Sequence, residues 1–317
     1  MSSLLDRFQK RAYSLLRVHG NYSPHLSPNL SIRRLCLIKI VVFRGFLISN
    51  LKNFSKKQAA LSNTKALKNT HSGIAALIIA NGPSARKLRV SGARDSQEVG
   101  SLKVFAVNFY FSLEPFEELV PDYLVLSDGA THRDSSDSRT VELWQHIDAN
   151  PSIKLISPMS WHKRSEFADC RAGTCLHFND ISFEGWSTNI SPVKSRGYPN
   201  NTAYKALAFA HHLGFDQIMV IGLDNTMFNQ LYVTSKNRIM LPSLHAGDYY
   251  QRDVDVTSHY ELGIGDVFYD LSELFLGLRR SFLECKILNL DQNSLIDCFP
   301  KLESGSEFSS LVTWPST

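Results

Sequence analysis

The first residues with the chemistry of a binding site are Asn81, Gly82 and Ser84, in the segment "LIIANGPSARKL" (residues 77–88). They directly follow an apolar run that is typical of a buried strand. Gly82 lets the backbone approach a ligand closely, and Ser84 can cap the following helix. At the carboxyl end of a parallel strand, the N–H groups of such a turn can bind an anion. A plain strand-to-helix turn uses the same residue types.

Polar residues follow three further apolar runs in the same way. Asn108 follows the apolar run of "VFAVNFYF", and Asp128 follows that of "YLVLSDGATH". Gly222 and Asp224 follow the apolar run of "MVIGLDNTMF". Each of them taken alone could be a turn or cap residue. Together they predict one site at the carboxyl edge of a sheet, because that edge is where open α/β sheets bind their ligands.

The elements that must position these residues are short strands that alternate with helices. Strands are expected at residues 75–80, 103–108, 122–128, 153–158, 217–222 and 286–290. Because these runs are apolar on both faces, they predict a mostly parallel, Rossmann-like α/β sheet flanked by helices. One helix is predicted from the capping pair Asn201-Thr202 to Gly214, and another from Asp266 to Phe282, where apolar residues recur every three or four positions.

Four segments resemble the motifs of the bacterial sialyltransferases of glycosyltransferase family 42. In the family's order and at similar distances, they are "LIIANGPSARKL", "VFAVNFYF", "LGFDQIMVIGLDN" and "ILNLDQNSL". The resemblance covers about residues 75–298 and implies a single GT-A-like nucleotide-binding domain with a small lid. It also implies inverting transfer of a sugar from a CMP-linked or other nucleotide-activated donor to a cell-surface glycan, with no metal or other cofactor.

The resemblance further implies which residues bind the donor. They are Asn81, Gly82, Ser84, Asn108, Asp128, Asn201, Thr202, Gly222, Leu223, Asp224 and Thr226. Asp128 stands where the family has an asparagine, and Thr226 stands where it has the first of two phosphate-binding tyrosines. These departures leave the transferred sugar open.

Two residues are predicted to carry the chemistry. Tyr232 lies at the family's spacing for a tyrosine on the donor phosphate, where its hydroxyl would stabilise the leaving group. His259 lies where the family has its general base, and histidine can deprotonate an acceptor hydroxyl near neutral pH. His245 is the alternative base. Both histidines belong to residues 228–264, which lack sustained periodicity and are predicted to form a lid over the donor.

No metal site is predicted. Asp253 and Asp255 form the D-x-D pair with which many glycosyltransferases hold Mg²⁺ or Mn²⁺, and this role is kept as an alternative to a solvated loop. Cys170, Cys175 and His177 have a spacing that is unusual for structural zinc. The chain has five cysteines and no C-x-x-C pair, so no disulfide framework and a reducing compartment are expected.

Charge divides the chain into a basic arm and a mildly acidic body. Residues 1–70 contain thirteen Lys or Arg and a single acid. Lys39 and Arg44 interrupt the apolar run of this arm, so it does not read as a spanning helix. An amphipathic segment on the anionic inner-membrane surface fits better, and a docking or oligomerisation helix is the alternative. Residues 57–73 are polar and small, which predicts a linker to the domain at 71–317.

The sequence therefore predicts a cytoplasmic, membrane-peripheral glycosyltransferase of the sialyltransferase type, with a nucleotide-sugar donor and a glycan or glycolipid acceptor. It contains no recognisable nucleic-acid-binding module, and self-association is left open. One alternative is a phosphotransferase related to the pterin pyrophosphokinase-like proteins, which share a G-x-G-P-S strand end. A second is a Rossmann-type dehydrogenase or methyltransferase, which is disfavoured because the turn has one glycine where a dinucleotide fingerprint has three. The third is a non-catalytic nucleotide-binding scaffold.

Overall fold

A computed structural model of the 317-residue chain describes the fold. It covers residues 47, 51, 54–98, 100–112, 119–164, 167, 175–180, 190–194, 201–226, 229, 231–241, 254–255, 264–282 and 285–312. The predicted residues His245, Asp253 and His259 lie outside the described residues, as does most of the basic arm.

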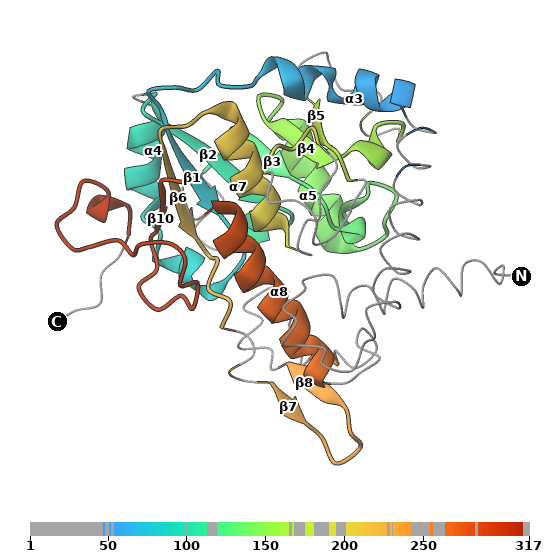
Figure 1. The fold of residues 1–317 in the computed structure, drawn as a ribbon, viewed down its shortest axis with the longest axis vertical. Helices are drawn as coiled ribbons and strands as arrows, with labels where there is room; N and C mark the ends of the chain where they lie inside the picture. Colours follow the sequence, from blue (N-terminus) through green and yellow to red (C-terminus); the bar gives the residue numbers. More distant parts are fainter. Residues whose placement is uncertain are drawn as a thin grey trace, which may run out of the picture.

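A seven-stranded sheet forms the centre of the domain (Figure 1). Its order is β10-β6-β1-β2-β3-β4-β5, and all neighbouring strands pair in parallel. The strands are β1 (Ala75–Ile79), β2 (Leu102–Val107), β3 (Tyr123–Val125), β4 (Lys154–Pro158), β5 (Cys175–Phe178), β6 (Gln217–Ile221) and β10 (Ile287–Asn289). The predicted parallel α/β sheet is confirmed. Only β5 was missed, because His177 interrupts its short apolar run.

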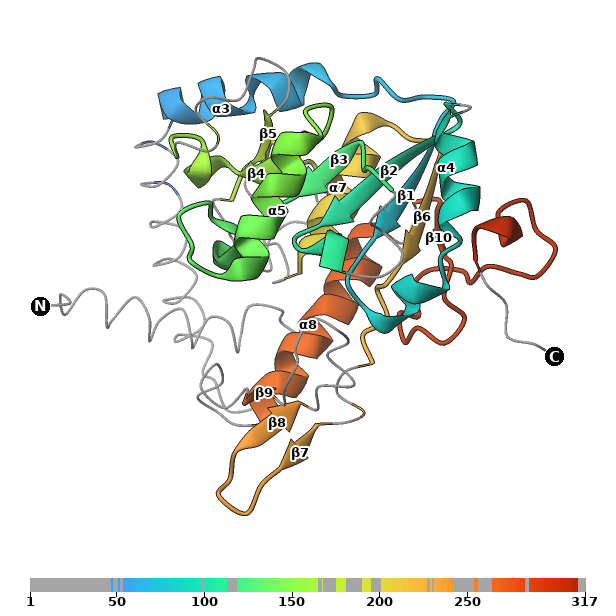
Figure 2. The ribbon, with the colours of Figure 1, turned by 180° about the vertical axis from the view of Figure 1, so that it is seen from behind.

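Helices cover both faces of the sheet (Figures 1 and 2). Alternate residues of a strand point to opposite faces. Ala76 and Ile78 of β1 therefore pack in the same core cluster as α7 and α8, whereas Leu77 and Ile79 pack with α4 and α5. The helices are α4 (Val90–Glu98), α5 (Ser138–Ala149), α7 (Thr202–Leu213) and α8 (Ile264–Phe282). Both helices predicted from the sequence exist.

Helix α7 begins and ends at the residues that the sequence predicts. The side chain of Asn201 accepts a hydrogen bond from the N–H of Tyr204, which caps the first turn. Gly214 ends the helix with a left-handed φ of 84°. The capping pair therefore lies at the carboxyl edge of the sheet, since α7 runs back from that edge to the start of β6.

The direction of winding reverses between β1 and β6. From β1 the chain adds β2, β3, β4 and β5 on one side, and then returns to place β6 and β10 on the other side. In open α/β sheets, ligands bind outside the carboxyl ends of the strands at such a reversal. Ile79 of β1 and Ile221 of β6 are register partners, so the residues that follow both strands start at the same edge.

The expected linker is instead largely a helix packed on the domain. Helix α3 (Phe54–Ala66) buries Leu61 and Thr64 completely. The hydroxyl of Thr64 donates to the carbonyl of His177 in β5 (2.8 Å) and accepts the N–H of the same residue (3.1 Å). Nε2 of His212 in α7 donates to the carbonyl of Thr64 (2.9 Å). The linker prediction was wrong because α3 has few apolar residues and attaches mainly through polar contacts.

A second, antiparallel sheet lies within residues 228–264. It consists of β7 (Tyr232–Val233), β8 (Ile239–Leu241) and β9 (Val254–Asp255), in the order β7-β8-β9. The hairpin of β7 and β8 projects from the body in both views, near the start of α8 (Figures 1 and 2). These short strands were not predicted, and a lid function for this region stays a prediction.

Two findings bear on the expected location of the protein. Within the part of the chain that the structure describes, no helix combines the length and the apolar character that a bilayer crossing requires. Cys175 in β5 is disulfide-bonded, which the low cysteine content did not lead us to expect.

Candidate active site at the carboxyl edge of the sheet

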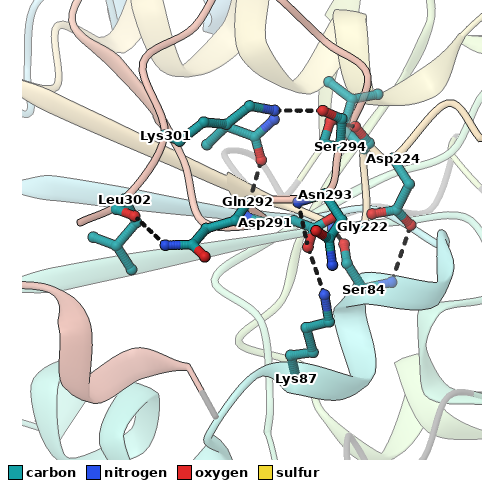
Figure 3. A network of polar contacts seen from close by, with 12 residues as sticks. Ser84, Lys87, Gly222, Asp224, Asp291, Gln292, Asn293, Ser294, Lys301 and Leu302 are labelled. Carbon is teal, nitrogen blue, oxygen red and sulfur yellow. Dashed lines mark hydrogen bonds and ion pairs between the residues drawn. The ribbon is translucent and has the colours of Figure 1, made fainter. Parts of the chain in front are cut away.

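The segments after β1 and β6 are bonded to each other beyond the sheet (Figure 3). The N–H of Gly82 donates to the carbonyl of Gly222 (2.9 Å), and the N–H of Gly222 donates to the hydroxyl of Ser84 (2.9 Å). The N–H of Ser84 then donates to Oδ2 of Asp224 (3.0 Å). The turn after β1 and the loop after β6 thus form one structure, which brings together four of the predicted site residues.

Gly82 and Ser84 link the two strand ends, and their predicted contact with the donor stays a prediction. A Cβ atom on Gly82 would overlap the carboxylate of Asp224 and the carbonyl of Gly222. On Gly222, where φ is 77°, it would overlap the carbonyl of Ala80. The space beside each glycine, where a side chain would lie, is therefore filled by the opposing strand end. The N–H groups of Gly82 and Ser84 both donate within the protein, and the Ser84 side chain also bonds to Asp224, so these two residues hold the strand ends together.

Asp224 shares its environment with a second carboxylate, Asp291, which follows β10. The two residues are only 5% and 3% exposed. Burial raises the pKa of Asp224 to about 6, and a hydrogen bond and charge repulsion from Asp291 add to this shift. The hydrogen bonds from Ser84 act in the opposite direction and lower the pKa. Lys87 donates to Oδ1 of Asp291 at 2.6 Å and balances the charge of that group.

The segment after β10 fixes the backbone of the β6 loop from the other side (Figure 3). The hydroxyl of Ser294 donates to the carbonyl of Leu223 (2.8 Å), and the N–H of Leu295 donates to the carbonyl of Asp224 (3.0 Å). Nζ of Lys301 donates to the carbonyl of Ser294 (2.6 Å). Leu223, a predicted nucleoside contact, is itself buried in this arrangement.

Four side-chain atoms at this edge lack hydrogen-bond partners among the described residues. They are Oδ1 of Asn81, Oδ1 of Asp224, Nδ2 of Asn225 and Nδ2 of Asn289, and all four are inaccessible to solvent. Asn225 has a left-handed φ of 53°, a conformation that asparagine tolerates better than most residues. An unpaired buried polar atom costs roughly 1–3 kcal/mol. Two acceptors and two donors at the ends of β1, β6 and β10 therefore point to a bound group that supplies the partners.

A second polar cluster lies at the ends of β2 and β3 and at the start of α7. Nδ2 of Asn108 donates to the hydroxyl of Thr202 (3.1 Å), which lies 2.7 Å from the hydroxyl of Ser127. Nζ of Lys205 donates to the hydroxyl of Ser127 (3.1 Å). Burial lowers the pKa of Lys205 to about 8, although Asp180 and Asp128 oppose this shift. The structure thus brings the predicted residues Asn108 and Thr202 together.

Ser127 and Lys205 were missed by the sequence analysis. At the end of β3 the sequence analysis chose the charged residue Asp128 and not its neighbour Ser127. Lys205 lies inside an apolar helix. The sequence did contain one usable signal for Lys205. It is a cation in the first turn of α7, where the helix dipole normally favours anions.

The other predicted residues have local roles or stand apart from these clusters. Asp128 is exposed and accepts the N–H of Ala130 (3.0 Å), as a cap residue does. Thr226 is partly buried, next to Asn225. Tyr232 lies on β7 and is 42% exposed. No group of three or more His, Cys, Asp or Glu side chains within the described ranges could hold a metal ion.

No protein-family model and no curated protein matches this chain. Among solved structures, the chain is similar to the MAf glycosyltransferase from Magnetospirillum magneticum AMB-1, with 12% identity and a TM-score of 0.43 over 79% of this chain. The match spans 38% of that longer protein. It is also similar to the sialyltransferase CstII from Campylobacter jejuni, with 15% identity and a TM-score of 0.39 over 76% of this chain and 94% of that one. At these low values neither similarity carries a functional argument.

Proposed function

We propose that this chain is a glycosyltransferase that binds a nucleotide-activated sugar at the β1/β6 switch point. The observation that carries the proposal is the group of unpaired polar atoms at the carboxyl edge of a parallel sheet, among them Asn81 Oδ1 and Asn225 Nδ2 at the β1/β6 junction. A nucleoside offers both hydrogen-bond donors and acceptors, so it can satisfy both atoms. The four sequence motifs, in the order found in the sialyltransferases, support a CMP-linked donor.

In this proposal the residues at the switch point divide the work. Asn81 and Asn225 contact the nucleoside, while Gly82, Ser84 and Asp224 hold the two strand ends in place. Asn108 and Thr202 meet the part of the donor that extends along the edge toward β3. Because the turn after β1 is bonded to the β6 loop, the site is preformed, which reduces the entropy lost on binding.

The chemical step of an inverting transfer sets two further requirements. The bond between the anomeric carbon and the phosphate oxygen breaks while the acceptor oxygen bonds to that carbon, and the acceptor proton passes to a base. We assign the base to His259, with His245 as the alternative, because an imidazole near its ordinary pKa accepts a proton at neutral pH. Tyr232 is assigned to the leaving phosphate, which a hydroxyl donor would stabilise. No step is assigned to a metal.

Thermal-shift measurements with CMP, UDP, GDP and CMP-sialic acid, each with and without Mg²⁺, test the proposal. A cytidine nucleotide is expected to raise the unfolding midpoint by mass action without Mg²⁺. The variants N81A and N225A should lose most of that shift. N150A is the matched control, because Asn150 caps the end of α5, before β4.

Two results would contradict the proposal. One is the absence of a shift with every nucleotide, which would leave the site without a nucleotide ligand. The other is a shift that requires Mg²⁺ and is accompanied by phosphoryl transfer, which would favour the phosphotransferase alternative. Transfer of radiolabelled sugar from the donor that binds to a glycan acceptor would complete the assignment.

A further inference from the structure

The second polar cluster, which consists of Asn108, Ser127, Thr202 and Lys205, has more hydrogen-bond donors than its own acceptors take up. The N–H of Ser127 donates to Oδ1 of Asn108 (3.2 Å), which fixes the amide so that Nδ2 points to Thr202. Lys205 is an ammonium group and donates to Ser127. Both ends of the chain of hydrogen bonds are therefore donors, and two hydroxyl groups lie between them.

One hydroxyl proton in this cluster has no acceptor. Each hydroxyl oxygen already accepts one hydrogen bond, from Asn108 at Thr202 and from Lys205 at Ser127. The 2.7 Å contact between the two hydroxyls uses one of their two protons. The other proton, and the N–H groups of Lys205 that do not reach Ser127, have no acceptor among the described residues. A ligand that complements this arrangement must supply acceptors.

The charge of Lys205 is not neutralised by an ion pair within the described part of the chain. The two nearest carboxylates that influence it are Asp180 and Asp128, and each of them accepts a backbone N–H, from Ser160 and Ala130 respectively. Nζ lies 5.6 Å from the centre of the Phe178 ring. The first turn of α7 contains no acidic residue. A partly buried cation at a helix N-terminus is unfavourable for folding, and such local conflicts concentrate at functional positions.

We propose that this Lys205 cluster binds an oxygen anion of the substrate, either a phosphate or a sugar carboxylate. The inference rests on the proposed function for the identity of the substrate. Strands that pair in a sheet lie about 4.8 Å apart, so the ends of β1 and β3 are about 10 Å apart. A nucleotide-sugar with its nucleoside at the switch point can extend to the Lys205 cluster. Ser127 and Lys205 then select donors by charge.

Competitive acetylation of the folded protein tests this directly. The protein is trace-labelled with acetic anhydride in the presence of inorganic phosphate, CMP or CMP-sialic acid, and modification of each lysine is measured by mass spectrometry. Labelling of Lys205 is expected to fall several-fold with at least one of these anions, because a bound anion covers the amine. Lys286, an exposed lysine just before β10, should show no change.

The three probes separate the sources of the anion. Protection by phosphate and CMP assigns the site to a phosphate, whereas protection by CMP-sialic acid alone assigns it to the sugar carboxylate. If nucleotides raise the unfolding midpoint but no probe protects Lys205, the inference is overturned and the proposed function stands. If phosphate protects Lys205 but no nucleotide binds, the anion site stands and the proposed function fails.

Affinity measurements on variants provide the second arm. K205M is expected to weaken binding of the protecting anion by roughly 10- to 100-fold, the usual worth of a hydrogen bond to a charged group. S127A should weaken it less, because it removes a hydroxyl and no charge. K286M is the matched control for the loss of one positive charge. Equal affinities for wild type, K205M and K286M would overturn the inference even if acetylation were reduced.

Discussion

The backbones of Gly82 and Gly222 approach each other so closely that neither position has room for a side chain. We therefore expect G82A to lower the free energy of unfolding by about 1–3 kcal/mol or more, the usual cost of overpacking. G129A is the control, because a Cβ at Gly129, after β3, meets no atom within 4 Å. Urea denaturation measures both variants. A stable G82A protein that fails only to bind nucleotide would instead restore the earlier view that Gly82 makes room for a ligand.

A second prediction concerns the proton on Asp224. Its pKa is about 6 in the folded protein and 3.8 in the ordinary state, so the folded protein binds this proton more tightly than the unfolded chain. The contribution of Asp224 to stability is therefore lost as the pH rises from about 4 to about 6. D224N mimics the protonated form. The free energy of unfolding of D224N minus that of wild type should therefore be larger at pH 7.5 than at pH 4.5, by on the order of 2 kcal/mol.

Urea titrations of wild type and D224N at both pH values provide the measurement. An equal difference at the two values would show that Asp224 is ionised throughout. N293A is a suitable control, because Asn293 contacts Asp291 only through its backbone N–H in the described structure and carries no charge.

Single residues could be predicted from the sequence where they directly follow an apolar run. Asn81 and Asn108 were placed at strand ends in this way, because a strand end is visible as a change from apolar to polar residues, and their contact with a ligand stays a prediction. Asp291 and Lys205 were not found, because their importance depends on neighbours far along the chain. Lys87, for example, contacts Asp291 across 204 positions. For Gly82 the sequence left two reasons open, because a close approach to another backbone and one to a ligand both require glycine, and the structure shows the first of them.

At the scale of elements, helix α3 gives the sharpest prediction. Leu61 is 0% exposed, so L61A should lower the free energy of unfolding by about 2–5 kcal/mol. S62A, one position further along on the exposed side, should change it by less than about 0.5 kcal/mol. Thermal or urea unfolding of both variants checks this. A neutral L61A would mean that α3 is detached in solution, as the linker prediction required.

The contacts of α3 also predict a dependence on pH. Burial, with a contribution from His162, lowers the pKa of His177 to about 4, and burial also lowers the pKa of His212. Because the folded protein holds both residues neutral, their contribution to stability is present above about pH 6.5 and is lost as the pH falls toward 4. Wild type should therefore lose more stability over this interval than H177Q does. Thermal unfolding of both proteins at several pH values measures this. The prediction is refuted if the unfolding midpoints of wild type and H177Q fall by the same amount over the whole pH range.

The success of the prediction differed between types of element. Long apolar runs identified β1, β2, β4 and β6 to within a residue or two. Strands that are buried on both faces are continuous apolar runs, which are easy to recognise in a sequence. The apolar run of β5 is interrupted by His177, and β7 and β8 contain only two and three residues, so none of these strands has a clear pattern. Helix α3 is held by Thr64 and a few buried side chains, and polar attachment of this kind has no periodic signature.

At the scale of the whole molecule, the basic arm can now be divided. Residues 1–53 contain nine Lys or Arg and one acid, whereas α3 belongs to the folded body. Deletion of residues 1–53 should abolish binding to anionic vesicles at low salt and leave the unfolding midpoint unchanged. Deletion of residues 1–70 should also lower the midpoint. Vesicle sedimentation and thermal unfolding measure the two effects. Failure of the full chain to bind such vesicles would favour the docking alternative.

The bonds that tie the turn after β1 to the loop after β6 also set the order in which the protein can fold. Ser84 and Asp224 are 140 positions apart, so their contact closes a very long loop. Chains dominated by such distant contacts fold slowly. During synthesis, β1 leaves the ribosome well before β6, and its unpaired edge must be kept from aggregating in the interval. The site therefore assembles late, and a fragment that ends before β6 would contain the Asn-Gly-Pro-Ser turn without the partners that give it a shape.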